Sequence, residues 1–206
     1  MRASWLFLFG ILASNGRVIT FDAGPLGKIP SEWMCVARGR APQWEIRRDG
    51  SAPTQPYVLA QVSAENAPDR LPLAILTTMS LRDGELSVRI KPVSGRAVKG
   101  GGIVWRYRDE NNYYLARASS LEKNVAVYKV QNGQPYRLAV VARHDVPAND
   151  WSILKVALRG SRFQVYVDHR RILQGWDNTY TGFGQVGLCT VGDSIAYFDD
   201  FRVYPK

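Results

Sequence analysis

The sequence predicts an all-β protein, a sandwich or barrel, and three observations carry that prediction. Apolar and polar residues alternate with a period of two in many short runs, most clearly from Leu86 to Lys91. Turn signals such as Asp49-Gly50, Asp83-Gly84 and Asn132-Gly133 recur along the chain. No segment of the 206 residues shows a sustained helical period.

The first half of the chain alternates between short β-type runs and loops that contain proline or glycine. Pro25, Pro30 and Pro53 place loops between the early runs. The expected strands are Arg17 to Ala23, Trp33 to Val36, Trp44 to Arg48, Tyr57 to Val62, Leu73 to Leu81 and Leu86 to Lys91.

The central stretch, Gly100 to Gly133, reads as three strands joined by polar turns. In its first strand, alternation places Trp105 on one face and Val104 with Arg106 on the other, which predicts a half-buried strand. The expected strands from here on are Ile103 to Arg108, Tyr113 to Ala118, Val125 to Val130, Tyr136 to Arg143, Ser152 to Leu158, Arg162 to Val167, Val186 to Val191 and Ile195 to Tyr204. A return strand after Val167 should begin at Ile172-Leu173. We expect the tryptophans Trp33, Trp44, Trp105 and Trp151 in the core.

The first 16 residues have the composition of an export signal. Arg2 precedes an apolar run of about eleven residues, too short to span a bilayer, and Ser14-Asn15-Gly16 offers a small-residue cleavage site. The alternative is a buried first strand or helix. We expect residues 1–16 to be a signal peptide, residues 17–206 to be a single β-sandwich domain without a membrane span, and the protein to be periplasmic or secreted.

The basic residues are spread singly along the strands. The chain has 27 Lys and Arg against 18 Asp and Glu, a formal net charge of +9. It contains no basic run longer than Arg170-Arg171 and no nucleic-acid-binding motif, so we expect solvated strand faces and no nucleic-acid partner.

The two cysteines, Cys35 and Cys189, lie far apart in the sequence. Export would allow them to form one disulfide, and two buried free thiols are the alternative. Neither a metal-type spacing nor a CxxC pair is present.

Several stretches together resemble the concanavalin A-like lectin/glucanase jelly rolls, especially the bacterial 3-keto-disaccharide hydrolase group. They are GGIVWRYRDENNYYLARASSLEKNVAVYKV from Gly101, SILKVALRGSRFQVYVD after Trp151, and GFGQVGLCTVGDSIAYFDDFRVY near the end. The resemblance covers most of Thr20 to Tyr204 and implies a jelly-roll β-sandwich of two antiparallel sheets. Members of this superfamily bind or cut carbohydrates, or serve as protein-interaction modules.

The acidic residues depart from the pattern of the glucanases of this fold. Those enzymes carry an ExDxxE arrangement on one strand, which supplies a nucleophile and an acid. None of the glutamates in this sequence stands in that pattern, and Gly100-Gly101-Gly102 replaces an N-S-G stretch typical of the keto-sugar group. We therefore assign no catalytic residue.

Guanidinium, carboxylate, amide and phenol groups gather in the central stretch. If its strands pair as a meander, these groups share one concave face, where they can hydrogen-bond sugar hydroxyls and stack on a pyranose ring. The alternative is that the arginines are cross-strand partners of Glu122 and Asp109. Trp176, in a glycine-flanked loop with Tyr180, either binds a sugar or plugs the sandwich end. The candidate carbohydrate-binding residues are Arg106, Tyr113, Arg117, Glu122, Asn124, Tyr128 and Trp176.

Three aspartates form a candidate calcium site. Asp199 and Asp200 lie in the last strand, and Asp22 follows the first. Carboxylate oxygens are the ligands that Ca²⁺ prefers, but one of these residues could instead cap a bulge or pair with Arg202. We expect no cofactor beyond this structural ion.

The sequence thus favours an exported domain that recognises a carbohydrate on its concave face. The alternatives are a hydrolase or lyase acting on a (keto-)sugar and a non-catalytic module that binds a protein of the cell envelope. Saturable glycan binding without turnover separates the first hypothesis from the other two.

Overall fold

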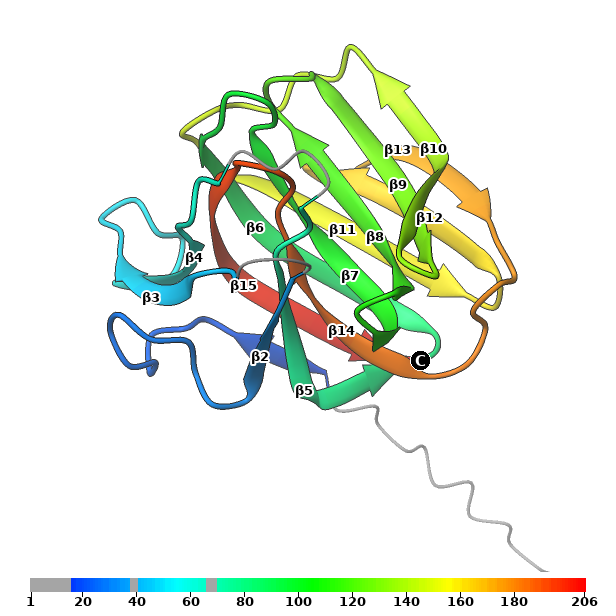
Figure 1. Ribbon diagram of the computed structural model, residues 1–206, viewed down its shortest axis with the longest axis horizontal. Helices are drawn as coiled ribbons and strands as arrows, with labels where there is room; N and C mark the ends of the chain where they lie inside the picture. Colours follow the sequence, from blue (N-terminus) through cyan, green and yellow to red (C-terminus); the bar gives the residue numbers. More distant parts are fainter. Residues whose placement is uncertain (1–15, 38–40, 66–69) are drawn as a thin grey trace, which may run out of the picture.

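Two antiparallel sheets packed face to face form the fold (Figure 1). The computed structural model describes residues 16–37, 41–65 and 70–206. The predicted all-β sandwich is confirmed. Apart from Gly16, the predicted signal peptide lies outside the described residues. Within the described ranges, no helix has the length and apolar character needed to cross a membrane.

The outer sheet has eight strands in the order β13-β12-β11-β6-β15-β4-β3, with β1 also paired to β15. Because β1 pairs with β15, the first and last described strands lie side by side. The strands are β1 (Arg17–Ile19), β3 (Trp44–Arg48), β4 (Tyr57–Gln61), β6 (Gly84–Ser94), β11 (Ser152–Arg159), β12 (Arg162–Val167), β13 (Arg170–Trp176) and β15 (Ile195–Pro205).

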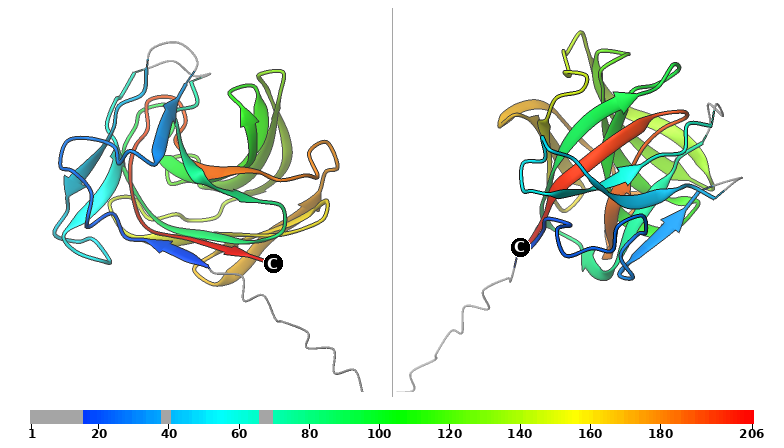
Figure 2. Two further views of the ribbon diagram at one scale, coloured as in Figure 1. Left: turned by 90° about the horizontal axis from the view of Figure 1, so that it is seen from below. Right: turned by 90° about the vertical axis from the view of Figure 1, so that its left-hand side faces the viewer.

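The inner sheet has seven strands in the order β10-β9-β8-β7-β14-β5-β2. They are β2 (Trp33–Val36), β5 (Leu73–Leu81), β7 (Gly100–Asp109), β8 (Asn112–Ser119), β9 (Asn124–Gln131), β10 (Gln134–Ala142) and β14 (Gly184–Cys189). Figure 2 shows that the sandwich is curved and that this sheet lies on the inside of the curve. Its face turned away from the outer sheet is called the concave face below.

The predicted strands are present, with changes at their ends. The first is shorter than expected, because β1 ends at Ile19 and Phe21 adopts a φ of 67°, which takes the chain out of the sheet. The return strand predicted at Ile172-Leu173 is longer and spans Arg170–Trp176.

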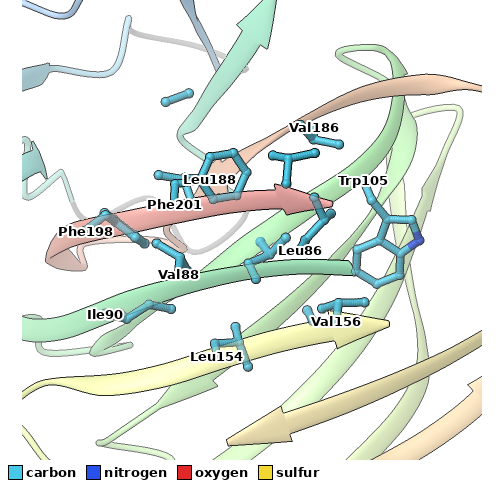
Figure 3. Close-up of a cluster of buried hydrophobic side chains, with 14 of the residues drawn as sticks. Leu86, Val88, Ile90, Trp105, Leu154, Val156, Val186, Leu188, Phe198 and Phe201 are labelled. Atoms are coloured by element: carbon cyan, nitrogen blue, oxygen red, sulfur yellow. The ribbon is translucent and has the colours of Figure 1, made fainter. Parts of the chain in front are cut away.

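The core lies between the two sheets and consists of aliphatic and aromatic side chains (Figure 3). It includes Leu86, Val88, Ile90, Trp105, Leu154, Val156, Val186, Leu188, Phe198 and Phe201. Burying each of these side chains stabilises the fold by about 1.5–3 kcal/mol before entropy is counted. Trp33, Trp44 and Trp105 are buried as predicted. Trp151 is not in the core: it is half-buried, and its indole N–H donates to Ser51 Oγ at 3.1 Å.

The cysteines are both free thiols. Cys35 on β2 is opposite Ala74, and Cys189 on β14 is opposite Leu73, so that β5 separates them. Two strand spacings put their backbones roughly 9–10 Å apart. A disulfide requires less than about 7 Å between Cα atoms, so the thiols are free as in the second alternative. Only Cys189 is buried, however, and Cys35 is exposed.

Strand β7 is buried on both faces, whereas alternation predicted a half-buried strand. Trp105 packs in the core, and Val104 is just as inaccessible on the concave face. The reason is its position, since β7 lies between β8 and β14 near the middle of the inner sheet.

A β-bulge at Arg106 interrupts the alternation of β7. The pairing register shifts between Trp105 and Asp109, and Arg106 has a φ of 49°. Regular alternation would place Arg106 beside Val104 on the concave face. The bulge instead turns its guanidinium away and brings Tyr107 to that face. Gly184 faces the bulge, and a Cβ there would lie 2.5 Å from the Arg106 backbone.

The Arg106 guanidinium joins three turns at one end of the sandwich. It donates to the carbonyl oxygens of Tyr180 at 2.6 Å, Arg82 at 3.0 Å and Gly160 at 2.5 Å. The side chain is 3% exposed and lies 3.6 Å from an Asp83 carboxylate oxygen. Arg106 is therefore a structural residue.

Replacing Arg106 with Met should lower the free energy of unfolding by about 3 kcal/mol, because three carbonyl groups lose their donor. Urea denaturation of the variant measures this loss. Arg137→Met, at an exposed position on β10, is the matched control and should change stability by less than about 0.5 kcal/mol. Equal stability of the two variants would show that Arg106 does not hold the turns.

A second bulge, in β15, buries a carboxylate. The register between β15 and β6 shifts from Asp199 to Arg202, and Asp200 has a φ of 50°. Asp199 is fully buried and accepts the backbone N–H groups of Thr54 at 2.8 Å and Asp200 at 2.7 Å. Burial raises the pKa of Asp199 to about 7, and the carboxylates of Asp200 and Asp22 act in the same direction.

The raised pKa makes stability depend on pH. Native Asp199 holds its proton up to about pH 7, whereas the unfolded chain loses it near the ordinary aspartate pKa of 3.8, so ionisation penalises the native state as pH rises. Asp199→Asn should therefore gain about 2 kcal/mol relative to wild type between pH 5 and pH 8.

Urea denaturation of both proteins across this pH range measures the difference. All other titratable groups are present in both proteins, so their contributions cancel in the stability difference. A stability difference that does not change with pH would report only the hydrogen bonds altered by the substitution. Parallel stability curves would contradict the assignment of a raised pKa to Asp199.

Candidate functional site

The concave face carries an apolar cluster separate from the core. Its members are buried although they lie outside the sandwich, because they pack against one another and against Val36, Leu71 and Tyr128. They are Leu73, Ile75, Val104, Tyr107, Tyr113, Leu115, Val130 and Cys189. This set is called the concave cluster below, and it forms an apolar floor on the concave face.

Arg117, Glu122 and Tyr128 come together beside this floor. Strands β8 and β9 pair in a regular register, with Arg117 opposite Ala126 and Tyr128 opposite Leu115. Side chains two residues apart on a strand share a face, so Arg117 and Tyr128 both lie on the concave face next to Leu115. Glu122 stands in the turn that joins the two strands, close to the end of each.

The contacts among the three side chains fix their orientation. Arg117 binds Glu122 with both terminal nitrogens, Nη1 to Oε2 and Nη2 to Oε1, the latter at 3.0 Å. Nη2 also donates to the Tyr128 hydroxyl at 3.3 Å, and the guanidinium carbon lies 5.5 Å from the centre of the tyrosine ring. A two-point pair of this kind is among the strongest side-chain interactions and restricts both groups.

Glu122 is the charged group of this set that is open to solvent. Its side chain is 34% exposed, against 8% for Arg117. Burial alone would raise the pKa of Glu122, but the hydrogen bonds and the charge of Arg117 outweigh it and lower that pKa. Glu122 is thus an ionised, oriented hydrogen-bond acceptor at neutral pH.

Two further predicted residues lie on the same face. Asn124 starts β9 opposite Ser119, and its buried amide oxygen has no hydrogen-bond partner among the described residues. Tyr113 belongs to the concave cluster, where its ring lies 5.8 Å from that of Tyr107. Sequence reasoning missed Ser119, whose hydroxyl accepts the Glu122 backbone N–H at 3.2 Å. Its spacing of two residues from Arg117 was the signal that could have revealed it.

Arg106 and Trp176 do not join this group. The bulge in β7 turns Arg106 away, so its predicted place beside Arg117 is wrong. Trp176 ends β13 in the outer sheet and is 70% exposed. Tyr180, from the following loop, is buried and donates its hydroxyl to the Val130 carbonyl at 3.0 Å. This loop therefore plugs the sandwich end with Tyr180, while Trp176 stays on the surface.

The predicted calcium ligands are engaged by protein donors. Asp22 accepts the Tyr57 backbone N–H at 3.1 Å, and both Asp199 oxygens accept backbone N–H groups. Asp200 accepts the Thr54 hydroxyl at 2.9 Å and Arg89 Nε at 3.1 Å. In the described part of the chain, no three His, Cys, Asp or Glu residues are placed to hold a metal ion. This arrangement does not favour a cation, and calcium binding here stays an untested prediction.

Comparison with known proteins finds similarity to one curated protein in sequence and to several solved structures in fold. No protein-family model matches it. Levanase from Bacillus subtilis (strain 168) is 31% identical over 119 residues, which are 56% of this chain. The match spans only 16% of levanase.

Two solved structures share the architecture closely. The carbohydrate-binding module CBM66 from Bacillus subtilis superposes with a TM-score of 0.65 at 22% identity, over 84% of this chain and 95% of the module. The β-glucanase of Bacillus licheniformis superposes with a TM-score of 0.64 at 10% identity, over 93% and 98% of the two chains.

Strand order, sheet pairing and these superpositions agree on the architecture. The narrower likeness to the 3-keto-disaccharide hydrolase group stays a prediction. This chain has the concanavalin A-like jelly-roll fold, a β-sandwich of two antiparallel sheets.

Proposed function

We propose that this protein binds a carbohydrate on its concave face and does not turn it over. The observation that carries the proposal is the ionised Glu122 carboxylate, held by Arg117 beside the apolar floor. A sugar ring offers hydroxyl donors at its edge and C–H groups on its faces. An oriented carboxylate beside aromatic and aliphatic side chains matches both features.

Glu122, Arg117 and Tyr128 have different roles in the proposed binding. Glu122 accepts hydrogen bonds from sugar hydroxyls, and these are strong because the acceptor is charged. Arg117 is a positioning residue, since its exposed area is small and its donors are directed at Glu122 and Tyr128. The half-buried Tyr128 adds a phenol hydroxyl and a ring edge next to the same acceptor.

The state of Glu122 argues against a role as the general acid of a glycosidase. A general acid needs a carboxyl group that is protonated near neutral pH, so its pKa must be raised. The pKa of Glu122 is lowered. Binding therefore fits this carboxylate better than proton donation.

The similar proteins supply the first ligands to test. The names levanase, carbohydrate-binding module and β-glucanase all point to glycans, which supports the assignment of this class of ligand. Levan and β-glucan are the first two polysaccharides to try. We also infer export, on the basis of the predicted signal peptide.

Replacing Glu122 with Gln should weaken glycan binding by roughly 10- to 100-fold, because a hydrogen bond to a charged group contributes about 1.5–3 kcal/mol. Affinity electrophoresis in gels that contain levan, β-glucan or other soluble polysaccharides measures the retardation of each variant. Glu110→Gln, exposed in the β7–β8 turn, is the control and should migrate like wild type.

Reducing-sugar release on the same polysaccharides distinguishes binding from hydrolysis. Retardation without released sugar is the expected result. Released sugar would favour the hydrolase or lyase hypothesis. Absence of retardation across the panel would reject glycan binding and favour a protein partner at the cell envelope.

A further inference from the structure

The outer sheet carries a small pocket on the side of the sandwich remote from Glu122. Its volume is about 190 Å³. Strands β6, β11 and β15 and the turn between β12 and β13 supply its walls. The lining residues are Ser87, Val88, Arg89, Ile153, Lys155, His169, Asp200 and Arg202. This set is called the outer pocket below.

The strand register explains why a hollow forms there. Ser87 on β6 lies between Lys155 on β11 and Arg202 on β15, and it is the direct cross-strand partner of both. Neighbouring strands are about 4.8 Å apart, so the backbones of Lys155 and Arg202 lie roughly 9–10 Å from each other. The short serine between them leaves the space above it open.

The pocket has an excess of positive charge. Arg89, Lys155 and Arg202 face a single lining carboxylate, Asp200, which leaves a formal charge of +2 with His169 neutral. The three cationic side chains are 38%, 32% and 43% exposed, so they can reach a ligand that arrives from solvent. Glu85 lies beyond the pocket and is shared between Lys155 at 3.4 Å and Lys206 at 3.0 Å.

Asp200 orients the guanidinium groups of Arg89 and Arg202 and leaves most of their N–H donors available. It accepts Arg89 through Nε at 3.1 Å and lies 3.5 Å from Nη2 of Arg202. Both terminal nitrogens of Arg89, and Nε and Nη1 of Arg202, make no hydrogen bond to any residue that the structure describes. The Ser87 hydroxyl likewise has no protein partner within the described ranges.

The turn that carries His169 is fixed beside this opening. Asp168 and His169 both have positive φ angles, 46° and 67°. The Asp168 carboxylate accepts the Ile153 backbone N–H at 2.8 Å, and its own N–H donates to the Ile153 carbonyl at 3.0 Å. Two consecutive positive φ angles are the geometry of the two-residue type I′ turn that joins β12 to β13, so the hairpin fixes the place of His169.

We propose that the outer pocket binds a tetrahedral oxyanion, a phosphate or phosphoryl group, through Arg89, Lys155, Arg202 and the Ser87 hydroxyl. Guanidinium groups match the oxygen pairs of such anions, and lysine adds a point charge. The size also fits. The pocket is smaller than the roughly 300–1,000 Å³ typical of sites for whole small molecules, yet it has room for five heavy atoms.

The test is a titration of the protein with inorganic phosphate at constant pH and ionic strength, followed by ¹H–¹⁵N correlation spectra. Saturable shifts should concentrate on the amides of Ser87, Arg89, Lys155 and His169. Arg202→Gln should weaken binding at least ten-fold, and Ser87→Glu, which places a carboxylate in the anion position, should abolish it.

Arg137→Gln is the matched control, since it removes the same charge from an exposed position on the inner sheet. Non-saturable shifts spread over the surface, or equal weakening by Arg137→Gln and Arg202→Gln, would overturn the proposal. Because Arg202→Gln also removes a partner of Asp200, Lys155→Gln serves as a second variant that leaves Asp200 untouched and should weaken binding as well.

Glucose 6-phosphate, titrated in parallel, identifies the source of the anion. Tighter binding than inorganic phosphate would show that the group is carried on a sugar, and equal binding would show that the free ion suffices. Both results support the oxyanion assignment. A lack of any specific shift with either compound would reject it.

Discussion

The position of β7 in the middle of the inner sheet is the constraint on which the other features depend. Core side chains cover one face of this strand and the concave cluster covers the other. At a regular position of this strand, the Arg106 guanidinium would lie beside Val104 among the apolar side chains of the concave cluster. The bulge at Arg106 resolves this conflict, because it moves the guanidinium to the end of the sandwich, where three carbonyl groups accept its hydrogen bonds.

Most of the fold could be predicted from the sequence, because strand period and turn residues act locally. Leu86 to Lys91 and Ser152 to Leu158 alternate regularly, and both strands are present with the expected faces. The bulge in β7 could not be predicted, because Arg106 requires the close approach of Gly184, which is distant in sequence. In β15, an aspartate at a bulge was one alternative to the calcium site, and Asp200, which contacts Thr54 and Arg89, lies at such a bulge. The sequence therefore misplaced Arg106 while it placed Arg117, Glu122 and Tyr128 on one face.

The concave face and the exposed face of the outer sheet differ in charge because their strands pair in different registers. On the inner sheet, regular pairing of β8 with β9 brings one arginine next to one carboxylate, and the cation is largely covered. On the outer sheet, β6 lies between two strands that each present a cation beside Ser87, so positive charge accumulates. One face thus offers an acceptor for hydroxyl groups, and the other offers donors for an anion.

A crystal structure of the protein with a bound oligosaccharide, taken from the polysaccharide that retards it most strongly, tests most directly whether Glu122 is the acceptor for a sugar. We expect a sugar ring over the concave face, with at least one sugar hydroxyl within about 3.2 Å of a Glu122 carboxylate oxygen. We also expect the Arg117–Glu122 pair to stay intact in the complex. A sugar bound at Trp176 or on the outer sheet, with Glu122 free of contact, would contradict this role of Glu122.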